Sequence, residues 1–173
     1  LSRYPAVWYS EGAKVITVRH NRPIPGAKSI DYIRAILVLA EAREKAAIEA
    51  VYVDSEGWVR EGTTSNIFAI FGGTLVTPGE GILSGITRQK VLGLAEGNYT
   101  VQIRDLQRGE LVAADEVFIT FPYKDLTASR SREPSVLSGN SLTNSTYWGF
   151  LKLAMRSPTK RINSADDKLF SAC

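Results

Sequence analysis

Three short stretches carry side chains that could do chemistry together. Lys28 lies in Pro-Gly-Ala-Lys-Ser-Ile-Asp-Tyr and supplies an amine that can condense with a carbonyl group. Glu61 heads the run Glu-Gly-Thr-Thr-Ser-Asn and supplies a carboxylate that can stabilise a ring cation. The run 83–88, Leu-Ser-Gly-Ile-Thr-Arg, is a turn that leads into a helix, and the amides at a helix N-terminus bind phosphate.

Each stretch alone has a simpler explanation, since loop lysines are mostly solvated and both Glu-Gly and Gly-x-Thr are common turn sequences. The combination is more specific, because an amine, a carboxylate and a phosphate-sized turn are the parts that hold pyridoxal phosphate. In order and spacing the three stretches resemble the large domain of the class IV pyridoxal-phosphate-dependent aminotransferases. That family includes branched-chain aminotransferases, D-amino-acid aminotransferases and aminodeoxychorismate lyase. The resemblance covers residues 10–127.

The resemblance implies the two central roles. Lys28 would form a Schiff base with the cofactor aldehyde and then move the α proton of the substrate, which favours a lysine with a lowered pKa. Glu61 would pair with the pyridine nitrogen and keep it protonated, so that the ring can act as an electron sink. The alternative for Lys28 is a solvated loop residue.

Further cofactor contacts follow from the same resemblance. Ile86 and Thr87 would hold the phosphate with backbone amides and a hydroxyl group. Ser65 would lie near the ring or the substrate, although a simple turn hydroxyl explains it equally well. Tyr32 could reach the phenolic oxygen of the cofactor, although a tyrosine of the core is the favoured interpretation. Arg88 is expected to be a surface residue.

The implied function is transamination, in which an amino acid gives its amino group to a 2-oxo acid in an enzyme that is a homodimer across the family. A lyase of the aminodeoxychorismate type uses the same cofactor parts and stays an alternative. A second alternative is a truncated, catalytically inactive remnant. After 116–120 the family places small polar residues that complete the phosphate site, whereas this chain reads Phe-Pro-Tyr-Lys, and Pro122 has no amide hydrogen.

The resemblance implies the first two of three expected parts of the chain, and composition separates the third. Residues 1–12 are expected to be a connector from a missing N-terminal small domain, 13–127 a partial domain that binds pyridoxal phosphate, and 128–173 an unassigned tail. The tail holds seven Lys and Arg against three Asp and Glu, together with nine serines. A basic tail can bind nucleic acid, but a solvated or disordered segment is the favoured interpretation.

Composition also bears on the cellular compartment and on which kinds of site the chain can form. Cys173 is the only cysteine, so no internal disulfide can form, and together with the lack of a secretion leader this predicts a cytoplasmic protein. No apolar run approaches the ~20 residues of a membrane-spanning helix. His20 has no second histidine with which to build a metal site. The chain starts at Leu1 and has a single methionine, Met155, which predicts a fragment.

Strands mixed with helices, together with one clear hairpin, predict a mixed α/β (α+β) fold with a mixed sheet. The resemblance implies the large domain of the D-amino-acid aminotransferase-like fold, an incomplete mixed sheet or partial barrel flanked by helices. The expected strands are 13–18, 50–54, 58–59, 66–71, 74–77, 99–104 and 116–121, and the expected helices are 29–47, 86–96, 106–113 and 147–155. The first helix is expected to be capped by Ser29 and to bury one apolar face. That face consists of Ile30, Ile33, Leu37 and Ala40.

Overall fold

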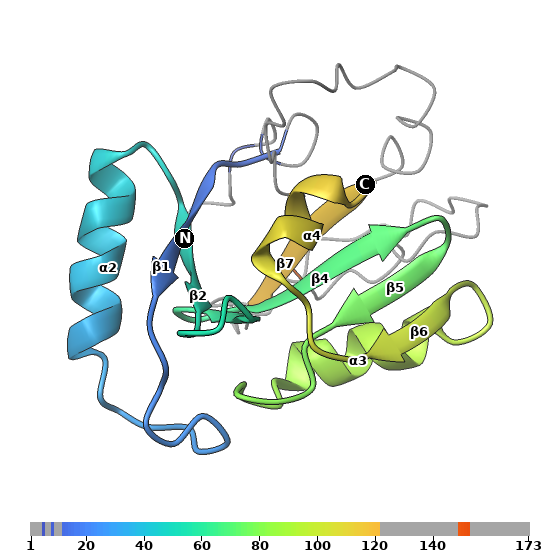
Figure 1. Cartoon of the computed structure of the whole chain (residues 1–173), viewed down its shortest axis with the longest axis horizontal. Helices are drawn as coiled ribbons and strands as arrows, with labels where there is room; N and C mark the ends of the chain where they lie inside the picture. The colour runs from blue at the N-terminus through green and yellow to red at the C-terminus, as the bar shows by residue number, and fades with distance from the viewer. Residues whose placement is uncertain (1–4, 6–7, 9–11, 122–148, 153–173) are drawn as a thin grey trace, which may run out of the picture.

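The computed structural model describes residues 5, 8, 12–121 and 149–152. Within these residues the chain forms a three-stranded sheet of order β1-β2-β3 and a five-stranded sheet of order β6-β5-β4-β7-β8 (Figure 1). The strands are β1 (Val15–Arg19), β2 (Glu49–Val53), β3 (Val59–Gly62), β4 (Asn66–Phe71), β5 (Thr74–Thr77), β6 (Thr100–Ile103), β7 (Glu116–Phe121) and β8 (Gly149–Lys152). The helices are α2 (Ile33–Glu44), α3 (Ile86–Ala95) and α4 (Arg108–Ala113). None of these helices is long and apolar enough to cross a membrane.

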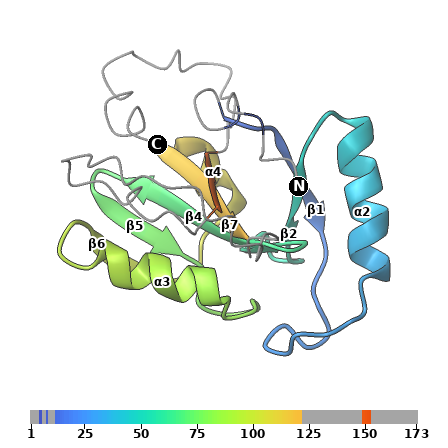
Figure 2. The ribbon, with the colours of Figure 1, turned by 180° about the vertical axis from the view of Figure 1, so that it is seen from behind.

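The small sheet is built around β2, all five residues of which are buried. β1 and β2 pair in parallel, so the chain between them must cross over, and α2 makes this crossover. Because successive side chains of a strand point to opposite faces, Ala50 and Tyr52 pack on the α2 side while Val51 and Val53 enter the central core. Figure 2 shows α2 lying outside β1 and β2.

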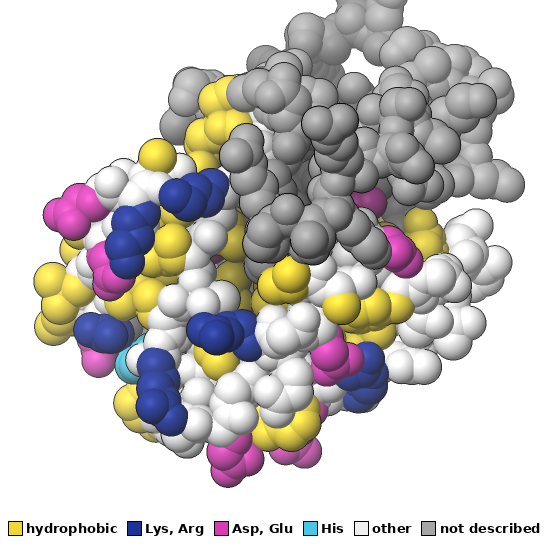
Figure 3. Space-filling view, turned by 45° about the horizontal axis from the view of Figure 1, so that its top comes forward, with side chains coloured by type: hydrophobic (Ala, Val, Ile, Leu, Met, Phe, Trp, Pro, Cys, Tyr) yellow, Lys and Arg dark blue, Asp and Glu magenta, His cyan; other side chains and the backbone are white. Residues whose placement is uncertain are grey.

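The helix that follows Lys28 differs from the expectation in its start and in its buried face. Ser29 does not cap it; its hydroxyl oxygen accepts a hydrogen bond from the Asp31 amide at 2.9 Å, and the helix begins at Ile33 after Tyr32. The buried face is made of small residues that allow the helix to approach the sheet closely, namely Ala35, Val38 and Ala42. The predicted face is therefore wrong, since Ile30, Ile33 and Leu37 are 95%, 72% and 59% exposed. Figure 3 shows hydrophobic side chains at the surface at the left of the view, where α2 lies.

The larger sheet confirms the predicted mixed topology, and the described strands form no closed barrel. β4 pairs antiparallel with β5 and with β7, whereas β5 and β6 are parallel and joined through α3. Gly72 and Gly73 turn the β4–β5 hairpin with φ of 51° and 84°, a conformation that glycine adopts without steric cost. The helix expected over 147–155 is wrong at 149–152, where β8 is a strand paired antiparallel with β7, and its remaining residues lie outside the described ones.

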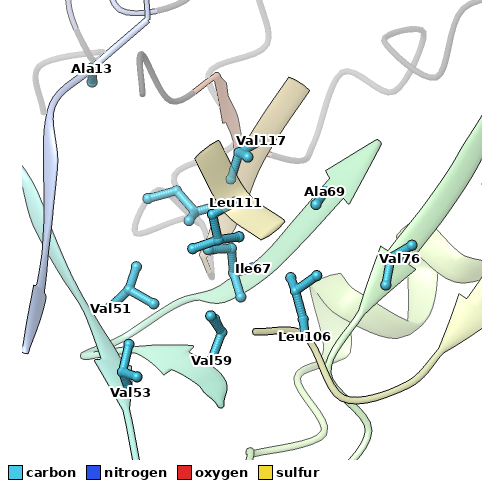
Figure 4. Packing of buried hydrophobic residues seen from close by; sticks show 11 residues of the cluster. Ala13, Val51, Val53, Val59, Ile67, Ala69, Val76, Leu106, Leu111 and Val117 are labelled. Carbon is cyan, nitrogen blue, oxygen red and sulfur yellow. The ribbon is translucent and has the colours of Figure 1, made fainter. Parts of the chain in front are cut away.

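The central core lies between the two sheets (Figure 4). Val51 and Val59 contribute from the small sheet, Ile67 and Val117 from the larger sheet, and Leu111 from α4. Each fully buried aliphatic side chain of this kind contributes about 1.5–3 kcal/mol. This packing places the end of β3 beside the start of β4, and the run that Glu61 opens lies between them.

Candidate active site

Glu61, near the end of β3, is a buried carboxylate with 4% of its surface exposed. Its Oε1 accepts a hydrogen bond from Arg22 Nη1 at 2.6 Å, and its Oε2 accepts one from the Leu83 amide at 2.9 Å. Burial raises the pKa of Glu61 above its ordinary value of 4.5, while the Leu83 amide and the Arg22 guanidinium oppose this rise. The carboxylate is therefore tied to two separate segments of the chain.

Arg22 connects Glu61 to the loop that carries the candidate amine. Its Nη2 donates to the carbonyl oxygen of Ala27 at 2.6 Å, one residue before Lys28. Lys28 itself is exposed. One guanidinium thus fixes the backbone beside Lys28 relative to the Glu61 carboxylate, although the two motifs are 33 residues apart in sequence.

The peptide groups of Leu83 connect Glu61 to the third motif. The Leu83 amide donates to Glu61, and the Leu83 carbonyl oxygen accepts a hydrogen bond from Asn66 Nδ2 at 2.8 Å. Asn66 also explains why residue 85, two positions after Leu83, is a glycine: a Cβ atom at Gly85 would collide with Asn66 Oδ1. The side chains of Glu61 and Asn66 together hold the turn that leads into α3.

The N-terminus of α3 is open to an anion. Gly85 is its N-cap, no side chain caps its first turn, and no acidic residue lies there. Since the first amides of a helix have no partner within the helix, an uncapped first turn suits a phosphate group. Ile86 is 76% exposed and Thr87 is buried at 5%, so Thr87 lies in the interior at this turn.

Two further polar residues, Arg88 and Thr120, are buried. Arg88 is not a surface residue: it is 4% exposed, and its Nη2 donates to the Pro78 carbonyl oxygen at 3.0 Å. Thr120, opposite Asn66 in the β4–β7 pairing, has a buried hydroxyl without a hydrogen-bond partner among the described residues. Both place polar atoms inside the fold.

The remaining candidates, Tyr32, Ser65 and His20, differ in burial and in their contacts. Tyr32 is 43% exposed, so the interpretation as a core tyrosine is wrong. Ser65 is buried, and its hydroxyl donates to Glu49 Oε2 at 3.0 Å. His20 is half-buried with its ring edge-on to Tyr52, and no group of metal-ligating side chains exists among the described residues.

Sequence reasoning missed three residues that organise this region: Arg22, Glu49 and Asn66. Arg22 lies six residues before Lys28 in a proline-rich loop, and nothing local indicates its distant partner. Glu49 begins a strand that is otherwise apolar, and a charged residue in such a strand is the one sequence signal that points to it. Asn66 closes the run that Glu61 opens, and the sequence predicts only that it begins a strand.

The residues present fit the parts of pyridoxal phosphate. A buried carboxylate, Glu61, suits a ring cation; an uncapped helix start suits a phosphate; and an exposed amine, Lys28, suits an aldehyde. The orphaned Thr120 hydroxyl adds an unused donor beside Asn66. The fit covers the segments that the structure describes and excludes 122–124.

Comparison with known proteins gives a consistent result. The probable branched-chain-amino-acid aminotransferase of Synechocystis sp. is 38% identical over 122 residues, which cover 68% of this chain and 40% of that protein. The crystal structure of the branched-chain amino acid aminotransferase of Escherichia coli is 31% identical with a TM-score of 0.59, covering 66% of this chain and 41% of that one. A putative 4-amino-4-deoxychorismate lyase from Legionella pneumophila is 31% identical with a TM-score of 0.59, covering 63% and 43%.

The chain thus spans less than half the length of these relatives. The family model described as amino-transferase class IV matches residues 3–121, which include all three motifs and the contacts that join them. The chain belongs to the amino-transferase class IV family.

Proposed function

We propose that this chain holds pyridoxal phosphate in an aminotransferase that moves an amino group from an amino acid to a 2-oxo acid. The observation that carries the proposal is the continuous set of contacts from Ala27 through Arg22, Glu61 and Leu83 to Asn66. These contacts join the amine, carboxylate and phosphate-turn motifs, which are separated in sequence. Class IV aminotransferases use pyridoxal phosphate, and this chain belongs to that family.

In this proposal the Lys28 amine would hold the cofactor through its aldehyde and would carry the proton to and from the substrate α carbon. Its exposure leaves the amine free to react. When bound, the cofactor supplies an electron-withdrawing ring that acidifies the α proton of the substrate. Arg22 favours the ionised form of Glu61, which then presents a negative charge to a ring N–H.

The other proposed contacts fix the orientation of the cofactor. The amides of Ile86 and Thr87 and the Thr87 hydroxyl would donate to the phosphate. Tyr32, exposed at the start of α2, would donate to the phenolic oxygen of the ring. Ser65 has its hydroxyl engaged by Glu49, so we propose that it shapes the ring pocket rather than donating to a ligand.

For the substrate, the similarity to the probable branched-chain-amino-acid aminotransferase of Synechocystis favours branched-chain amino acids as donors. Lyase chemistry is the second candidate, since a lyase is among the solved neighbours at similar identity. We further propose that the active form is a homodimer. An inactive remnant stays a third outcome of the test below.

The test is a two-stage assay on the full chain. Pyridoxal phosphate is titrated first while absorbance and quenching of the tryptophan fluorescence are recorded. The protein is then given either L-valine with 2-oxoglutarate or 4-amino-4-deoxychorismate. Glutamate formation with saturable cofactor binding supports transamination, and consumption of the second substrate alone supports a lyase. Cofactor binding with neither reaction supports the inactive remnant, and absence of cofactor binding contradicts the proposal.

A further inference from the structure

Glu49 is a buried carboxylate that has no place in the roles proposed above. It is the first residue of β2 and is 5% exposed. No Lys, Arg or His pairs with it in the part of the chain that the structure describes. Burying a carboxylate without a cation destabilises the fold unless hydrogen-bond donors surround it. The donors around Glu49 therefore indicate its structural role.

These donors come mainly from one short run. Glu49 Oε1 accepts from the Thr63 amide at 3.2 Å and from the Thr63 hydroxyl at 2.6 Å. Oε2 accepts from the Ser65 hydroxyl at 3.0 Å and from the Thr64 hydroxyl at 3.5 Å. The Ala50 amide, next to Glu49 itself, adds a bond of 2.8 Å to Oε1. Hydrogen bonds to an ionised acceptor are stronger than neutral ones, so the run 63–65 is firmly attached to the start of β2.

The attached run lies between two residues of the candidate site. Glu61 precedes it near the end of β3, and Asn66 follows it at the start of β4. The Gly62 amide donates to the Ser65 carbonyl oxygen at 2.7 Å, which closes the run into a tight turn. A Cβ atom at Gly62 would meet the Ser65 hydroxyl and, at 3.2 Å, the Glu49 carboxylate. The turn is therefore packed directly against Glu49.

We infer that Glu49 is a positioning residue: it anchors the turn so that Glu61 and Asn66 hold the two sides of Leu83 at a fixed separation. Glu61 accepts from the Leu83 amide and Asn66 donates to the Leu83 carbonyl oxygen. Loss of the Glu49 acceptors would loosen both ends of this clamp together. The consequence for cofactor binding rests on the proposed function, whereas the consequence for the Leu83 amide does not.

A purely stabilising role would have a different signature, and the chain contains a second carboxylate for comparison. Asp54 is also buried, 7% exposed, and accepts from the Glu56 and Trp58 amides at 2.9 Å. Unlike Glu49, it also pairs with a cation, Arg60, whose Nη2 donates to Asp54 Oδ2 at 2.6 Å. It holds the turn at the other end of β2, between β2 and β3. If both carboxylates only stabilise the β2–β3 pair, their loss should loosen the same amides.

The experiment measures amide hydrogen exchange by NMR in the full chain, in the Glu49→Gln and Asp54→Asn variants. A carboxamide keeps the volume of Glu49 but has one acceptor oxygen in place of two, so part of the turn loses its attachment. The inference predicts that exchange of the Leu83 and Gly62 amides accelerates about tenfold in Glu49→Gln relative to the β4 amides. Asp54→Asn should accelerate the Trp58 amide and leave Leu83 unchanged.

Ser65→Ala provides a second variant that keeps Glu49 and removes a single donor, and it should accelerate the same two amides to a smaller extent. Unchanged Leu83 exchange in Glu49→Gln and Ser65→Ala would overturn the inference, as would equal acceleration of the same amides by Asp54→Asn. The dissociation constant for pyridoxal phosphate is measured on the same samples, and it should rise about tenfold in Glu49→Gln and stay constant in Asp54→Asn. If the parent binds no cofactor, the proposed function fails while the exchange data still decide the role of Glu49.

Discussion

Arg22 Nη1 lies 2.6 Å from Glu61 Oε1, and the same guanidinium donates to the Ala27 carbonyl oxygen. The contact gives the buried carboxylate a cationic partner from a loop 39 residues earlier in the chain. It also places the backbone before Lys28 next to Glu61. This ion pair explains how a surface loop and a strand end can act as one site.

The ion pair predicts a pH effect with a definite sign. Glu61 has a pKa raised above 4.5, chiefly by burial, so its stabilising contribution is complete below the unfolded pKa and is lost as pH rises through the folded pKa. Arg22→Met removes a group that opposes this rise, so the pKa of Glu61 should increase further. We expect the stability deficit of the variant, relative to the parent, to be larger at pH 7 than at pH 4.

The pKa of Glu61 is read from the 13C shift of its carboxyl carbon, and stability from urea unfolding at both pH values. Arg104→Met is the matched control, since Arg104 pairs with Glu110 rather than Glu61. An unchanged or lowered Glu61 titration midpoint in Arg22→Met would refute the coupling.

A second prediction concerns the phosphate turn. Thr87→Val keeps the shape of a buried side chain and removes the hydroxyl that is proposed to donate to phosphate. Affinity for pyridoxal phosphate should fall about tenfold, as expected for one charge-assisted hydrogen bond. Affinity for pyridoxal, which lacks the phosphate, should change little. Thr100→Val, an exposed threonine on β6, is the control; equal losses for both ligands would remove Thr87 from the phosphate site.

A third prediction concerns two glycines with opposite surroundings. A Cβ atom at Gly62 would meet Ser65 and Glu49, whereas Gly93 lies inside α3 with no atom within 4 Å of the added carbon. Gly62→Ala should destabilise the fold by about 1–3 kcal/mol, because the crowded turn must shift. Gly93→Ala should stabilise it by about 0.5–1 kcal/mol, because alanine favours the helix. Urea unfolding measures both, and effects of the same sign would contradict the packing at the Glu61–Asn66 turn.

The sequence predicted the strands well where local pattern and turn chemistry agree. The strands 66–71, 74–77 and 116–121 have the expected bounds, since β-branched and aromatic residues alternate there and Gly-Gly sets the hairpin. The buried face of α2 could not be predicted in this way. Apolar residues lie on two sides of that helix, and only its packing on Ala50 and Tyr52 selects the side with Ala35, Val38 and Ala42.

The candidate site shows the same division. Lys28, Glu61 and Thr87 stand out because each lies in a short motif of suitable residue types. The Arg22–Glu61 contact spans 39 residues and the Glu49–Thr63 contact spans 14, and contacts at such separations leave no local pattern. The surface position expected for Arg88 is wrong, because its burial depends on a tertiary contact with the Pro78 carbonyl oxygen.

The most direct test of the whole account is reductive trapping of pyridoxal phosphate on the parent chain, with the modified peptide located by mass spectrometry. The account predicts a visible absorbance band that borohydride removes, with the label on Lys28. Lys28→Ala should lack the band and Lys90→Ala, which changes an exposed lysine of α3, should keep it. A label spread over several lysines, or an equal band in Lys28→Ala, would show that Lys28 does not hold the cofactor.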